Sequence, residues 1–296
     1  MSWRHRLSAF SIATLIFAQE NPVTTFRTES NLVSLNVSVF DREGRVLKGL
    51  PQSAFTVFED NQKQEIKVFR QEDVPISLGL IIDASASMFD KRDRVNLAAL
   101  AMVKASNPDD EVFVISFSDE AYVTQDFTSD LKRLESSLRK FESKGETAMR
   151  DALSVGLDHL RGHARKDKKV LLVITDGEDN SSIQRQENLV RAAQLSNVII
   201  YGIGILGSEQ PASAQRAKAS LDGLTLATGG RSWFPADVTG IGQITPEIAH
   251  EIRNQYVIGY TPENTAAKGG FRSIRVETNV PNATVRTRSG YYSQSR

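Results

Sequence analysis

Residues 76–87 have the sequence Ile-Ser-Leu-Gly-Leu-Ile-Ile-Asp-Ala-Ser-Ala-Ser, and this stretch decides the fold. The part up to Ile82 is almost continuously apolar, which is typical of a strand buried on both faces of a parallel sheet. The part from Asp83 to Ser87 is small and polar. In open α/β sheets ligands bind beyond the carboxyl ends of the strands, so these polar residues are candidates for a functional site.

Working outward from this strand, buried apolar segments alternate with segments of helical periodicity. The predicted strands are residues 76–82, 112–117, 170–174 and 198–205, with an edge strand at 122–127 and a short strand at 231–234. The predicted helices are residues 91–106, 129–142, 147–165, 184–196, 211–228 and 245–254. Alternation of this kind predicts an α/β fold with an open, mostly parallel, doubly wound sheet, which is Rossmann-like in its layering.

The two flanks of this region have a different pattern, because apolar and polar residues alternate there with a period of two. This pattern covers residues 31–70 and returns after residue 255, with turn signals such as Gly269-Gly270 and Pro281-Asn282. A small set of strands with one apolar face must bury that face against another surface. We therefore predict that residues 25–73 and 256–292 fold together as an accessory β-rich domain. Within the second flank, Thr284–Tyr292 is predicted as one strand.

The composition excludes several classes of function. Lys+Arg and Asp+Glu both number 36 and no long basic run occurs, so we expect no nucleic-acid partner. The absence of cysteine excludes disulfides, thiolate metal sites and cysteine nucleophiles.

The amino terminus has the pattern of a secretory signal peptide. Arg4 and Arg6 precede an apolar stretch from Leu7 to Ala18, which is shorter than the roughly 20 residues that span a bilayer. We expect residues 1–18 to be a signal peptide and the protein to be exported to the periplasm, the cell envelope or the extracellular space. An uncleaved membrane anchor is an open alternative.

Five oxygen-bearing residues fall on loops that should meet at one edge of the predicted sheet. They are Asp83, Ser85, Ser87, Thr147 and Asp176. Side chains two positions apart on a short turning segment can point the same way, so the first three converge. Oxygen ligands suit hard cations, and we predict a Mg²⁺ site here, with Mn²⁺ or Ca²⁺ as alternatives. Because three of the donors are neutral hydroxyls, the ion would retain affinity for a further carboxylate. Ordinary turn and cap residues are the alternative explanation.

This set resembles the metal-ion-dependent adhesion site (MIDAS) of von Willebrand factor type A (VWA) domains, and all five positions match. The resemblance covers residues 76–255. It implies that Ser85 and Ser87 coordinate the ion directly, that Thr147 binds directly or through water, and that Asp83 and Asp176 act mostly through water. It also implies a protein partner that offers an acidic side chain.

The flanking segments resemble a group of exported bacterial proteins that embed such a domain. The segments that carry this second resemblance are Val37–Asp41, Phe55–Asp60 and Gln255–Tyr260. The predicted organisation is a signal peptide (1–18), a β-rich part (25–73), a VWA domain (76–255) and a second β-rich part (256–292).

Other patterns carry less weight. The glycines of Gly202–Gly207 fit G-x-G-x-x-G but lie within and after a late strand, so we predict close helix packing and no nucleotide site. His159 and His163 have no acidic residue in an H-E-x-x-H arrangement and are interpreted as a solvated helix face. Asp109 and Asp110 precede a strand and are interpreted as solvated loop residues.

Three functions remain open at this stage. The first is a non-enzymatic binding module that uses Mg²⁺ to capture an acidic residue of a protein partner. The second is a Mg²⁺-dependent phosphoryl-transfer enzyme with Asp83 as nucleophile and Asp176 as metal ligand; Ser85 stands where such enzymes generally carry a second carboxylate. The third is a structural scaffold. We favour the first and predict no catalytic residue.

Overall fold

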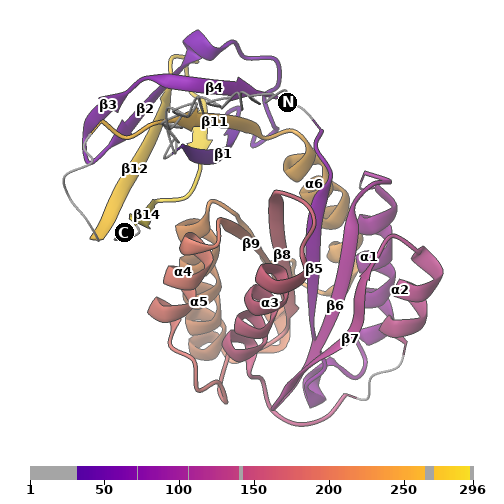
Figure 1. Cartoon of the computed structure of the whole chain (residues 1–296). Coiled ribbons are helices and arrows are strands. Elements are labelled where there is room, and N and C mark those ends of the chain that lie inside the picture. The colour runs from indigo at the N-terminus through magenta and orange to yellow at the C-terminus, as the bar shows by residue number, and fades with distance from the viewer. Residues whose placement is uncertain (1–31, 72, 106, 140–142, 264–269, 294–296) are drawn as a thin grey trace, which may run out of the picture. The chain divides into compact units, whose positions relative to one another are not determined.

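A six-stranded sheet organises residues 76–233 of the computed structural model, which describes residues 32–71, 73–105, 107–139, 143–263 and 270–293 (Figure 1). The strand order is β10-β9-β8-β5-β6-β7, and only β7, at one edge, runs antiparallel to its neighbour. Every residue of β5, β6 and β9 is buried, as the apolar segments predict. The strands are β5 (Ile76–Asp83), β6 (Glu111–Phe117), β7 (Ala121–Thr128), β8 (Lys168–Thr175), β9 (Val198–Gly204) and β10 (Ser232–Trp233).

Helices cover both faces of this sheet, so the predicted doubly wound α/β fold is confirmed (Figure 1). Buried residues of α1, α2 and α6 share one apolar core with one face of the sheet, and those of α3, α4 and α5 share a second core with the other. The helices are α1 (Arg92–Ala105), α2 (Leu131–Leu138), α3 (Met149–His163), α4 (Gln186–Leu195), α5 (Pro211–Thr228) and α6 (Ile241–Arg253). None of the helices among the described residues has the length and apolar composition needed to cross a bilayer.

The last helix begins earlier than its predicted start at Thr245. It starts at Ile241 and contains Pro246. Ile241, Thr245, Ile248 and Ile252 are all buried and recur at helical spacing, so packing on the sheet extends the helix past the proline.

Two four-stranded antiparallel sheets combine strands from before and after the α/β region. Their orders are β13-β1-β11-β4 and β14-β12-β2-β3, and a common apolar core lies between them. The central pairs are β1 with β11 and β2 with β12. The strands are β1 (Val33–Phe40), β2 (Phe55–Glu59), β3 (Gln62–Gln64), β4 (Ile66–Arg70), β11 (Tyr256–Tyr260), β12 (Gly270–Thr278), β13 (Thr284–Arg286) and β14 (Gly290–Ser293).

The prediction of a single strand over Thr284–Tyr292 was wrong, because β13 and β14 belong to different sheets. The break at residues 287–289 is held by hydrogen bonds to other elements. Ser289 N donates to Ala227 O at 3.3 Å, and the Arg288 guanidinium donates to Gln194 O and Ser34 O. The division of the chain into separate domains at residues 73–76 and 255–256 stays a prediction. The predicted signal peptide lies outside the described residues.

Candidate functional site

The polar residues after β5 and β8 lie side by side because these strands are neighbours. β5 and β8 are parallel, with Ile82 opposite Ile174, so they end at the same edge of the sheet. Asp83 is the last residue of β5, and a 3-10 turn, Ala86–Met88, follows it. Asp176 comes directly after β8.

A continuous chain of hydrogen bonds joins four of the five predicted site residues. Thr175 Oγ1 donates to Asp83 Oδ2 at 2.6 Å, and Ser85 N donates to Asp83 Oδ1 at 2.8 Å. Ser85 Oγ and Ser87 Oγ are 3.1 Å apart, and Ser87 Oγ donates to Asp176 Oδ1 at 2.8 Å. The Asp83-x-Ser85-x-Ser87 spacing therefore brings both hydroxyls to the same side as Asp176.

The loop that carries Thr147 is bound to the loop after β5. Lys144 N donates to Ala84 O at 2.9 Å, and Ala86 N donates to Gly145 O at 3.2 Å. Gly145 has a φ of +80°, a conformation that glycine adopts without steric cost. These backbone bonds bring residues 144–148 beside the serines.

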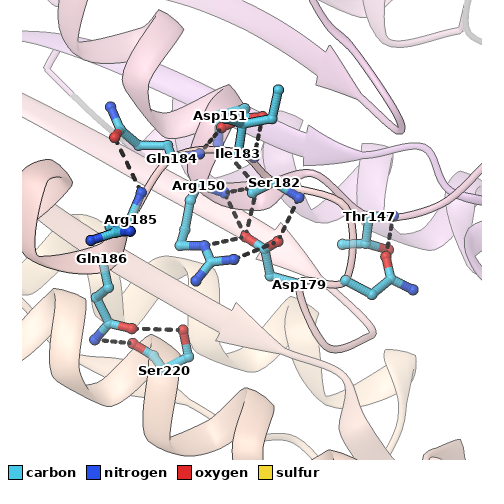
Figure 2. A network of polar contacts seen from close by, with 11 residues as sticks. Thr147, Arg150, Asp151, Asp179, Ser182, Ile183, Gln184, Arg185, Gln186 and Ser220 are labelled. Carbon is cyan, nitrogen blue, oxygen red and sulfur yellow. Dashed lines mark hydrogen bonds and ion pairs between the residues drawn. The ribbon is translucent and has the colours of Figure 1, made fainter.

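The fifth predicted residue, Thr147, lies next to the loop that follows Asp176. A Cβ atom added to Gly177 would be 3.9 Å from Thr147 Oγ1 and 3.9 Å from the Glu209 carboxylate. Thr147 N also donates to Asn180 Oδ1 at 3.0 Å (Figure 2). The Thr147 hydroxyl therefore lies beside Gly177, the residue that follows Asp176.

The amino terminus of α3 holds the loop that follows Asp176, between β8 and α4 (Figure 2). Asp151 accepts hydrogen bonds from the backbone N–H groups of Ile183 and Gln184 at 3.0 and 2.8 Å. In return, Asp179 accepts from Arg150 N at 2.8 Å and forms an ion pair with the Arg150 guanidinium. Carboxylates at a helix amino terminus satisfy backbone donors and complement the helix dipole. The loop that bears Asp176 is therefore bound to the start of α3 through residues 179, 183 and 184.

Both acids of the site are buried. The exposed fractions of Asp83 and Asp176 are 2% and 0%. Burial raises the pKa of Asp83 to about 6; the hydrogen bonds from Thr175 and Ser85 oppose this rise, and the charge of Asp176 adds to it. Lys91, just before α1, pairs with Asp176, and its Nζ lies 2.5 Å from Oδ2.

The donor set fits a small divalent cation. Adjacent oxygens around Mg²⁺, with bonds of about 2.1 Å, lie about 3.0 Å apart in an octahedron. The Ser85–Ser87 and Ser87–Asp176 oxygen separations of 3.1 and 2.8 Å match this spacing. No group of three or more His, Asp or Glu residues in the described part of the chain forms a metal cluster, so hydroxyl oxygens must complete any such set.

Sequence reasoning missed three neighbours of the site. Thr175 holds Asp83, Lys91 neutralises Asp176, and Glu209 lies beside Gly177. Thr175 precedes the Asp-Gly pair and carried a usable signal, because a polar residue at the end of a buried strand is unusual. Lys91 and Glu209 carried none, because both lie on loops whose contacts depend on the fold.

Two interpretations of other polar residues were each wrong for one member of a pair, since His163 and Asp109 are exposed as predicted but His159 and Asp110 are not. His159 is packed rather than solvated: its ring stacks on Phe127 at a centroid distance of 5.3 Å, and its side chain is 12% exposed. Asp110 is buried and accepts hydrogen bonds from Ile76 N and Asn107 N at 2.8 and 3.0 Å, so it caps the start of the sheet.

Of the glycines at 202–207, Gly202 packs against a helix as predicted. A Cβ atom on Gly202 would lie 2.7 Å from the Leu221 side chain of α5, so this glycine permits close contact between the helix and β9.

Comparisons with known proteins agree with this architecture. A family model for the von Willebrand factor type A domain matches residues 78–178. An uncharacterized protein of Borreliella burgdorferi is 24% identical over 155 residues, which is 51% of this chain and 45% of that protein. The chain thus spans less than half the length of this curated relative.

Two solved structures share the fold at low sequence identity. A von Willebrand factor type A protein from Catenulispora acidiphila is 13% identical, with a TM-score of 0.52 over 91% of this chain and 75% of that chain. Proximal thread matrix protein 1 from the mussel byssus, solved with a zinc-occupied MIDAS motif, is 17% identical, with a TM-score of 0.52 over 66% of this chain and 49% of that chain. The α/β region, which contains the residues that match the family model, thus has the fold of von Willebrand factor type A domains.

Proposed function

We propose that this chain is a protein-binding module that depends on a divalent metal ion. The supporting observation is the line of oxygens formed by Ser85 Oγ, Ser87 Oγ and Asp176 Oδ1, whose separations suit adjacent ligands of a small ion. Asp83 is joined to this line through the backbone N–H of Ser85. Thr147 Oγ1 lies beside Gly177, the residue that follows Asp176, and in this proposal it adds a further oxygen. In this proposal Ser85, Ser87 and Thr147 supply neutral donors, and the two aspartates supply charge.

Mg²⁺ is the ion that we propose, with Mn²⁺ as a close substitute. Ca²⁺ has longer bonds, which place adjacent oxygens about 3.3–3.7 Å apart and favour more ligands than this set offers. The zinc in the MIDAS motif of the mussel protein supports a divalent cation at this type of site. A bound ion would act as a Lewis acid toward an incoming oxygen.

The partner that we propose offers an Asp or Glu side chain. With two acids and three hydroxyls as protein donors, an octahedral shell has room for one more anionic oxygen. A carboxylate from another protein fills that position with a direct electrostatic gain. The protein's own residues orient the ion and keep its protein-facing side away from bulk water, because Asp83, Ser85 and Asp176 are all buried.

Metal binding is tested by titrating Mg²⁺ into the protein in a calorimeter. The double variant Ser85→Ala plus Ser87→Ala should lose Mg²⁺ binding, because it removes two neutral ligands and leaves the fold's apolar cores intact. Ser136→Ala, an exposed serine on α2, is the matched control and should bind like the wild type. Unchanged Mg²⁺ affinity in the double variant would refute the proposal. Absence of Mg²⁺ binding by the wild type would favour the alternative function, a structural scaffold.

Partner recognition is tested with pairs of immobilised peptides that differ only in Asp against Asn, or Glu against Gln. The wild type should be retained by acidic peptides in Mg²⁺ and released by EDTA, whereas the double serine variant should not be retained. Equal retention by acidic and amide peptides would refute carboxylate capture.

We propose no catalytic role for Asp83. Its two carboxylate oxygens accept hydrogen bonds from Thr175 Oγ1 and Ser85 N, and the residue is 2% exposed. A phosphoryl nucleophile needs an accessible oxygen in line with the leaving group. Phosphatase turnover that Asp83→Asn abolishes would reverse this assignment.

We also propose that the protein acts outside the cytoplasm, on the basis of the basic and apolar pattern over residues 1–18. Fusion of these residues to a reporter enzyme that is active only after export should give activity. A charged residue in place of Leu15 should abolish it, because it interrupts the apolar segment. Equal reporter activity for both fusions would contradict export through this segment.

A further inference from the structure

Lys91 places a positive charge inside the proposed metal site. It lies after the turn that carries Ser87 and immediately before α1. Its Nζ is 2.5 Å from Asp176 Oδ2, while Asp176 Oδ1 accepts from Ser87 Oγ at 2.8 Å. Both oxygens of this fully buried carboxylate are therefore engaged by the protein's own groups.

The charges around the two acids are uneven. Asp83 accepts hydrogen bonds from two neutral donors, Thr175 Oγ1 and Ser85 N, whereas Asp176 forms an ion pair with the Lys91 ammonium. A buried carboxylate without a counter-charge is costly, so the ammonium compensates for part of the burial of this acidic pair.

We propose that Lys91 is an internal competitor of the divalent ion: it holds Asp176 in the ion-free protein and must release it when the ion binds. This inference rests on the proposed function. Two features of Lys91 suit it to the role. An ammonium on a flexible stem can move to solvent while the stem stays in place, and the side chain is 19% exposed, so a route to water exists.

Competition follows from the electrostatics of a shared ligand. A divalent ion that draws on Asp176, directly or through water, lies within a few ångströms of the ammonium, and like charges at that distance repel strongly in a buried site. Part of the free energy of ion binding is then spent on displacing Lys91. The site therefore binds metal more weakly than its oxygen set alone allows, and Lys91 sets the ion concentration at which the site fills.

The test compares Mg²⁺ dissociation constants of the wild type, Lys91→Gln and Lys91→Met. Lys91→Gln keeps a hydrogen-bond donor for Asp176 without the charge and protects against misfolding of the ion-free variant. We expect both variants to bind Mg²⁺ at least about tenfold more tightly than the wild type, which corresponds to about 1.4 kcal/mol of removed competition. Lys132→Met, which removes an exposed charge from α2, is the control and should leave the constant unchanged.

A second readout separates competition from a structural role. Without Mg²⁺ the Lys91 variants should melt at a lower temperature than the wild type, because Asp176 loses its counter-charge. Saturating Mg²⁺ should raise their melting temperature by more than it raises that of the wild type. Equal Mg²⁺-induced shifts, or weaker Mg²⁺ binding by Lys91→Gln, would overturn the inference while leaving the proposed function intact. No Mg²⁺ binding by the wild type or the variants would overturn both.

Discussion

Gly145 connects the loop of Thr147 to the loop after β5, and its missing side chain is what allows this contact. Its φ is +80°, and a Cβ atom there would lie 2.1 Å from Asp119 Oδ2 and 2.8 Å from Asp119 Cγ. Asp119 is not free to move away, because its Oδ1 accepts a hydrogen bond from Glu146 N at 2.8 Å. A substitution therefore has to break a contact that shapes the loop.

Gly145→Ala is predicted to destabilise the protein by about 1–3 kcal/mol more than Gly44→Ala. Gly44 is a matched control, because it has the same φ of +80° but no atom within 4 Å of an added Cβ. Both variants pay the conformational cost of a positive φ, and only Gly145→Ala adds a clash. Urea denaturation of the two variants measures the difference; equal losses would show that the Asp119 contact is unimportant.

At the same scale, the oxygen-bearing residues of the site could be predicted from the sequence, but the Lys91 ammonium beside them could not. Asp83, Ser85 and Ser87 are two positions apart, and Asp176 follows a recognisable strand, so strand adjacency was enough to bring them together. The contact between Lys91 and Asp176 joins residues 85 positions apart through a long, flexible side chain. No local pattern encodes such a contact. The metal-binding role of these oxygens itself stays a prediction.

At the scale of elements, the start of the central sheet depends on one member of an aspartate pair that sequence alone does not distinguish. Asp110 is buried and accepts from Ile76 N, the first residue of β5, whereas Asp109 is exposed. Burial raises the pKa of Asp110, and its hydrogen bonds from Ile76 N and Asn107 N oppose that rise. The pair sits at the edge opposite the candidate site, so its role is structural.

Asp110→Ala is predicted to lower the free energy of unfolding by about 1–3 kcal/mol, because it leaves buried backbone donors without an acceptor. Asp109→Ala should change it by less than about 0.5 kcal/mol, as expected for an exposed residue. Chemical denaturation of both variants provides the comparison. A loss in Asp109→Ala as large as that in Asp110→Ala would contradict this assignment.

Periodicity predicted most elements of the α/β region because the central strands there are covered on both faces and each helix packs one face on the sheet. It failed over Thr284–Tyr292, where alternation continues but the chain changes sheets. The break depends on Arg288 and Ser289 bonding to carbonyls of α4 and α5. Those partners lie far away in the sequence, so the alternation pattern carries no sign of them.

At the scale of the whole molecule, a buried lysine joins the central sheet to the last helix. Lys168, at the start of β8, donates from Nζ to Ile252 O of α6 and is 7% exposed. Burial lowers its pKa to about 8, and the nearby carboxylates of Asp73, Asp110 and Glu251 oppose this effect. The Lys168 amine therefore binds its proton less readily in the folded protein than in the unfolded chain.

This lysine makes stability depend on pH in a definite direction. Between its folded pKa of about 8 and its unfolded value of 10.5, the unfolded chain retains the proton that the native state has lost. Stability must then rise with pH across this window. The pKa difference corresponds to about 3 kcal/mol at most.

Lys168→Met removes this dependence and keeps most of the side-chain volume. The free energy of unfolding of the wild type, minus that of the variant, should therefore increase from pH 8 to pH 10.5 and stay flat below pH 7. Taking the difference cancels the titration of exposed lysines and tyrosines, which both proteins share. A difference that stays constant, or falls, over that range would mean that Lys168 is solvated in the native state, and the contact between β8 and α6 would have to be reassigned.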